Sequence, residues 1–87
     1  MPEPQHDEAL VNNYMERVSA LSVSAFDGAD VMQELTQLMR EATTKLGGGG
    51  NIAVLQARLK DRADAAEREE QPQVRDTFAN AASMLNA

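Results

Sequence analysis

The sequence KLGGGGNIAVLQ, residues 45–56, places four consecutive glycines between two aliphatic segments near the middle of an 87-residue chain. Glycine adopts backbone conformations that other residues avoid, so this run indicates either a point where the chain reverses or a flexible tether between two parts. Helix connections of about 2–8 residues usually carry mixed polar residues, and four glycines exceed what a tight turn needs. We interpret Gly47–Gly50 as a hinge between two helical arms, with an engineered tether as the alternative.

The segment before the glycines, residues 7–46, has the periodicity of a helix. Its apolar residues recur at steps of three and four, which places them on one face. Asp-Gly at residues 27–28 is a turn signal, and Asp30 is a good N-cap for a second helix. We therefore predict a break or sharp kink at Asp27–Asp30, although glycine alone does not forbid one continuous helix.

The segment after the glycines, residues 51–86, has the same periodicity. Asn51 is an N-cap candidate, and residues 60–73 contain no large apolar side chain, only alanines. This alanine-rich stretch predicts either very close packing on a partner helix or exposure to water. Pro72 disfavours the helical conformation at Gln71 and is suited to the first turn of a new helix.

Together these patterns predict an all-α fold, an antiparallel helical hairpin broken into three or four segments that form a bundle. Residues 1–6 are expected to be a disordered lead-in and residues 7–87 one helical domain. Folding at the glycines would bring Met39 to Leu59 and Met32 to Ala66. We call the predicted core and interaction residues the apolar stripe; they are Val11, Tyr14, Val18, Leu21, Met32, Leu35, Met39, Leu46, Ile52, Leu55, Leu59, Val74, Phe78 and Leu85.

Composition narrows the classes of function. The net charge of −6 argues against nucleic acid and against anionic membranes as partners, because both are bound through basic patches. Only three residues are aromatic and none is cysteine, so base stacking and thiolate metal sites are not expected. The sequence shows no Sec signal and no apolar run of membrane-spanning length. It predicts a soluble, cytoplasmic protein, although leaderless export would leave no signal in the sequence.

The sequence does not indicate catalytic, cofactor-binding or metal-binding residues. His6 is the only histidine and lies in the lead-in, without a positioned partner. Asp61, Asp64 and Glu67 share a helix face but are interleaved with basic residues, which is typical of a solvated face. The acids of Asp27–Asp30 are too few for a calcium loop, and we interpret them as turn and capping residues.

We therefore expect a non-enzymatic helical interaction module, of the adaptor, docking or chaperone-like kind, that binds a protein partner or itself through the apolar stripe. The alternative is a structural subunit of a larger homomeric assembly, such as a secretion-type helical-hairpin filament. Methionine is flexible and polarisable, so methionines that lie near the helix seams suggest either core filling or an adaptable partner-binding groove. They are Met15, Met32, Met39 and Met84.

Overall fold

The computed structural model describes residues 8–47 and 50–85, and in these ranges the chain is all-α, with four helices and no strand. None of the described helices is long and apolar enough to cross a membrane. The all-α class predicted from the periodicity is confirmed. The helices are α1 (Glu8–Phe26), α2 (Met32–Leu46), α3 (Asn51–Arg68) and α4 (Pro72–Met84).

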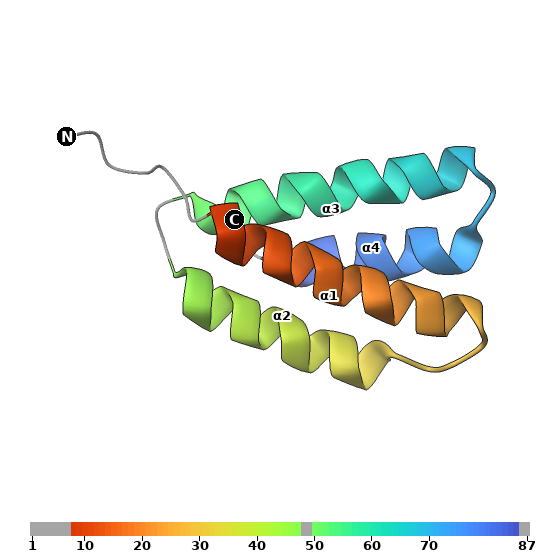
Figure 1. Cartoon of the computed structure of the whole chain (residues 1–87), viewed down its shortest axis with the longest axis horizontal. Helices are drawn as coiled ribbons and strands as arrows, with labels where there is room; N and C mark the ends of the chain where they lie inside the picture. The colour runs from red at the N-terminus through yellow and green to blue at the C-terminus, as the bar shows by residue number, and fades with distance from the viewer. Residues whose placement is uncertain (1–7, 48–49, 86–87) are drawn as a thin grey trace.

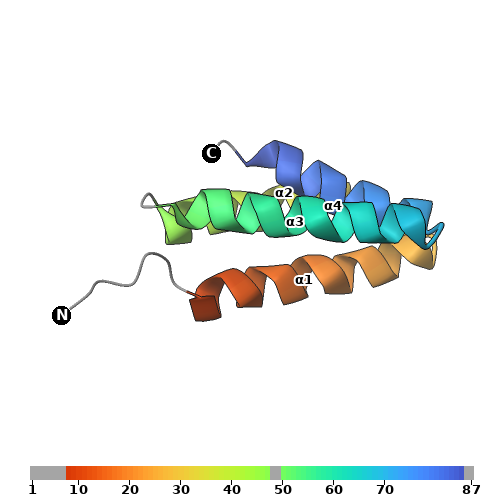
Figure 2. The ribbon, with the colours of Figure 1, turned by 90° about the horizontal axis from the view of Figure 1, so that it is seen from above.

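The four helices form an antiparallel bundle in which the chain alternates direction from one helix to the next (Figure 1). Viewed as in Figure 1, α1 and α4 lie in the middle, with α3 on one side and α2 on the other. Figure 2 shows α1 and α4 on opposite sides of the layer that α2 and α3 occupy. α1 and α4 nevertheless pack extensively on each other. α2 and α3 pack on each other less than any other pair of helices.

The first reversal, between α1 and α2, is a left-handed turn at Gly28. Gly28 has φ 101°, a conformation that side chains disfavour. The Ala29 N–H donates to the Ser24 carbonyl at 3.0 Å, and the Gly28 N–H donates to the Ala25 carbonyl at 3.0 Å. This pair of bonds is the Schellman motif, which satisfies the last carbonyls of a helix. The predicted break at Asp27–Asp30 is confirmed, and a continuous helix over residues 7–46 is excluded.

The reversal between α3 and α4 uses the same motif without a glycine. The Gln71 N–H donates to the Ala66 carbonyl at 2.9 Å, and the Glu70 N–H donates to the Glu67 carbonyl at 3.1 Å. Glu70 itself has φ 58° and is the only described non-glycine residue with positive φ. Pro72 then occupies the first turn of α4, as predicted.

The structure does not show the predicted hairpin of two long arms folded on each other at the glycines. That layout would make α2 and α3 close partners, through Met39 with Leu59 and Met32 with Ala66, yet these two helices have the least packing between them. The physical reason is that each arm reverses on itself, at Gly28 and at Glu70.

The core is one cluster of buried side chains drawn from all four helices. Its most closely packed part lies between α3 and α4, where Ala63 of α3 and Ala81 and Ala82 of α4 are buried. Because alanine is small, two helices lined with it can approach closely, and the close-packing interpretation of the alanine-rich stretch is confirmed. Gln56 links the same pair, since its Nε2 donates to the Ala82 and Leu85 carbonyls, each at 2.9 Å.

Two capping predictions change in detail. Asn51 is the first residue of α3 rather than its N-cap, which is Gly50 in a left-handed conformation. The Asn51 side chain instead donates to the Leu46 carbonyl at 3.2 Å, so it caps the end of α2. Asp30 lies one residue before the N-cap Val31, but its carboxylate still accepts the Met32 N–H at 3.1 Å.

The described residues cover only part of the glycine run, and they do not include the N-terminal segment, residues 1–7. Gly47 and Gly50 both have positive φ, at 64° and 92°. Gly48, Gly49 and residues 1–7 lie outside the described ranges, so the hinge, the tether and the disordered lead-in stay predictions.

Phe78→Ala should reduce the free energy of unfolding by about 3–5 kcal/mol, because Phe78 is fully buried and its truncation leaves a cavity. Phe26→Ala is the matched control, since the Phe26 side chain is 55% exposed, and it should change stability by less than about 0.5 kcal/mol. Chemical denaturation followed by circular dichroism measures both values. Equal losses for the two variants would contradict the observed core.

Glu70→Gly should raise the free energy of unfolding by about 1 kcal/mol, because glycine adopts the left-handed conformation at residue 70 without steric cost. Glu69→Gly removes the same charge at a residue with φ −91°. It should lower stability, since glycine loses more conformational entropy on folding. Thermal melts of the two variants give the comparison, and a lower melting temperature for Glu70→Gly would refute the turn geometry.

Candidate functional site

The structure brings the apolar stripe together inside the bundle rather than on its surface. Eleven of its fourteen residues are buried, and Leu21 and Val74 are half-buried. Met32 is the exception, with 44% of its surface exposed. Because the helices use this stripe to pack on one another, a partner would have to bind elsewhere on the molecule.

The other candidates from the sequence do not form a reactive cluster. Asp61, Asp64 and Glu67 are all exposed along α3. Among the described residues, no group of three or more His, Cys, Asp or Glu side chains is placed to hold a metal ion. Ser22 is buried, and its hydroxyl donates to the Ser19 carbonyl at 2.6 Å within the same helix. His6 lies outside the described ranges.

A polar cluster joins α1 to α2 on the outside of the bundle. Arg17 forms an ion pair with Glu41 at 2.8 Å, and the Tyr14 hydroxyl donates to the same carboxylate at 3.1 Å. The Arg17 guanidinium also lies 5.4 Å from the centre of the Tyr14 ring. Hydrogen bonds from Arg17 and Tyr14 lower the pKa of Glu41, while burial and the Glu41 hydrogen bond raise the pKa of Tyr14. The cluster joins the two helices, because each of its polar groups forms a hydrogen bond or an ion pair with another.

Glu41→Gln should lower the melting temperature of the bundle at neutral pH. The difference from the unmodified chain should become smaller in acid. The folded pKa of Glu41 is lowered, so its stabilising effect is present above the unfolded value of 4.5 and is lost as the pH falls through the folded value. The effect should be small, because the carboxylate is exposed. Melting temperatures from pH 3 to 8, with Glu16→Gln as the control on α1, give the profile. A deficit that is independent of pH would contradict this role.

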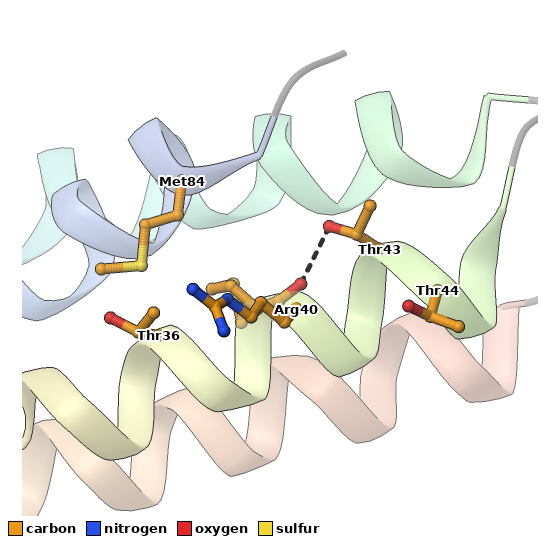
Figure 3. Close-up of a pocket in the computed structure, with 6 residues that line it drawn as sticks. Thr36, Arg40, Thr43, Thr44 and Met84 are labelled. Atoms are coloured by element: carbon orange, nitrogen blue, oxygen red, sulfur yellow. Dashed lines mark hydrogen bonds between the residues drawn. The ribbon is translucent and has the colours of Figure 1, made fainter.

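An open groove of about 520 Å³ runs between α2 and α4 (Figure 3). We call it the α2–α4 groove. In Figure 3 the Met84 side chain points from α4 toward α2, and the other side chains drawn come from α2. Met32 lies beyond the groove, at the start of α2. The Asn80 side chain of α4 donates to the Met32 sulfur at 3.6 Å. The groove is lined by Thr36, Met39, Arg40, Thr43, Thr44 and Met84.

The lining is mostly apolar, with one cation. The Thr36 and Thr43 hydroxyls donate to the carbonyls of Met32 and Met39, at 2.8 and 2.9 Å, so their hydrogen-bonding needs are met within α2. The methyl groups of these threonines are then available as apolar lining. Arg40 is exposed and has no ion pair within the described part of the chain. The groove can therefore receive an apolar surface that carries one negative charge.

Sequence reasoning identified part of this groove and missed the rest. The predicted apolar stripe includes Met32 and Met39, and Met84 is predicted only to lie near a helix seam. The prediction does not include Thr36 and Thr43, although they alternate with the two methionines at steps of four, three and four along α2. A helix face that alternates large apolar residues with threonine indicates a face that is only half covered by its neighbours.

Comparison of the chain with protein-family models, with curated proteins and with solved structures found no match.

Proposed function

We propose that the protein is a non-enzymatic interaction module that binds one amphipathic helix of a partner protein in the α2–α4 groove. The observation that carries this proposal is the groove itself, in which the half-buried Met84 of α4 points toward the threonine-lined flank of α2, with the exposed Met32 at the start of the same helix. Grooves that bind helices use this kind of surface, because methionine adapts its shape to different apolar partners.

The weak packing of α2 supports the choice of occupant. α2 makes fewer contacts with α3 and α4 than α1 does, so its flank toward α4 is open. A partner helix laid along this flank would present apolar residues at i, i+3 or i+4 and i+7 to Met32, Met84 and the threonine methyl groups. Arg40 favours an acidic residue on that helix.

The composition supports a protein partner over other classes. The chain has a single histidine and no cysteine, and its net charge of −6 repels nucleic acid and anionic membranes. The proposal therefore includes no cofactor and no metal. The remaining alternative is that the groove receives a helix from a second copy of the chain, which would make the protein a structural subunit of a homomeric assembly.

Arg40→Glu should weaken partner binding at least about tenfold, because it places a like charge opposite the acidic residue of the bound helix. Lys45→Glu is the matched control, since it reverses the charge of an exposed residue on the same helix that does not line the groove. A photo-crosslinker at Thr36 identifies the partner in the host cell. The purified partner is then titrated against both variants and the unmodified chain.

Two results would contradict the proposal. One is a complex whose affinity is the same for Arg40→Glu, Lys45→Glu and the unmodified chain. The other is growth of the isolated chain to ever larger species with rising concentration in sedimentation experiments, which would favour the structural subunit.

A further inference from the structure

An exposed aromatic residue marks a second surface, away from the α2–α4 groove. Phe26 is 55% exposed and Val23 is 58% exposed, whereas the other two aromatic residues, Tyr14 and Phe78, are no more than 1% exposed. Leaving a phenylalanine in water forgoes roughly 1.5–3 kcal/mol of burial free energy. An apolar pair of this kind is typical of a surface that a partner covers.

The exposed pair borders a pocket of about 230 Å³ that joins α1 to the other hairpin. Val23 and Phe26 form the α1 side, and Val74 and Gln71 form the side near the start of α4. The Arg62 guanidinium completes the α3 wall and lies 5.4 Å from the centre of the Phe78 ring. The pocket therefore combines three apolar side chains, Val23, Phe26 and Val74, with a polar lining of Ser19, Ser22, Gln71 and the Arg62 cation.

Both left-handed reversals lie at this end of the bundle, which we call the turn end and define as residues 22–34 and 67–76 (Figure 1). The turn end has seven acidic and two basic residues, a net charge of −5 in a chain whose net charge is −6. One of the two basic residues, Arg75, is paired with Asp76 at 2.8 Å. The other acids of the turn end form no ion pair within the described ranges.

The net charge of the turn end determines which kind of partner would bind at this pocket. The net negative charge of the turn end attracts a positively charged segment, raises its rate of association and disfavours acidic partners. The turn end of a second copy would carry the same charge of −5 and would be repelled, as would an anionic membrane. We propose that the turn end binds a basic amphipathic segment of another protein, with apolar anchors on Phe26, Val23 and Val74 and lysine or arginine near the acidic residues of the two turns.

The pocket at the turn end is separate from the α2–α4 groove, since it is lined by α1, α3 and the start of α4, whereas the groove is lined by residues 36–44 of α2 and by the end of α4. The two surfaces prefer opposite charges, an acidic helix at Arg40 and a basic segment at the turn end. A molecule with both would bridge two different partners.

A titration with two synthetic helical peptides tests this inference. One peptide alternates leucine with lysine at helical spacing, and the other replaces every lysine with glutamate. The lysine peptide should bind the full chain, weakening at least about tenfold between about 50 and 200 mM salt, and the glutamate peptide should not bind. Fluorescence anisotropy of labelled peptide measures both.

Matched variants locate the binding. Phe26→Ser should weaken binding of the lysine peptide at least about tenfold, whereas Met84→Ser, at a half-buried residue that lines the α2–α4 groove, should leave it unchanged. Neutralising Asp27 and Asp30 to asparagine should reduce the salt dependence more than neutralising Asp61 and Asp64, which lie along α3. All four acids are exposed, so every variant is expected to fold.

The proposal is overturned if the two peptides bind equally, if neither binds, or if Phe26→Ser and Met84→Ser have the same effect. It is also overturned if the chain self-associates without peptide and Phe26→Ser abolishes that association, because a second copy would then be the occupant. None of these variants alters Arg40, so failure here leaves the groove proposal standing, and failure at the groove leaves this one standing.

Discussion

The left-handed backbone at residues 28 and 70 is the constraint on which the rest of the structure depends. Each residue closes a Schellman motif, and each sends the chain back along the helix that it has just left. Without these two reversals, the matching apolar periodicities of residues 7–46 and 51–86 would favour two long helices packed against each other along their whole length. With them, each arm becomes a short hairpin, and the bundle is built from two hairpins.

The unequal packing of the four helices follows from that arrangement. α3 and α4 approach closely because alanines line their interface, at Ala63, Ala81 and Ala82. α1 packs extensively on α4, which lies behind it in the view of Figure 1. α2 is left on the outside, fastened to α1 through Arg17 and Glu41 and open on its other flank. The groove between α2 and α4 is thus a consequence of how the hairpins fit together.

The same arrangement separates the surface charges. Because both reversals lie at one end, their acidic residues gather there, although they come from segments about forty residues apart in the sequence. The segment between the two turns is different, since residues 35–66 have five basic and three acidic residues. This uneven charge supports the proposal that the two surfaces bind different partners.

The sequence by itself determined the helical class, the break near Gly28, the helix start at Pro72 and most of the large side chains of the core, because these depend on local periodicity and on backbone preferences of single residues. It could not determine which helices are neighbours, since the two arms have the same apolar spacing and either a hairpin or a bundle would bury it. Only the tertiary structure decided that Phe26 lies in water while Phe78 is enclosed, and that Thr36 and Met84 face each other across a groove. Burial of a side chain depends on what packs above it, and that information lies in segments far away along the chain.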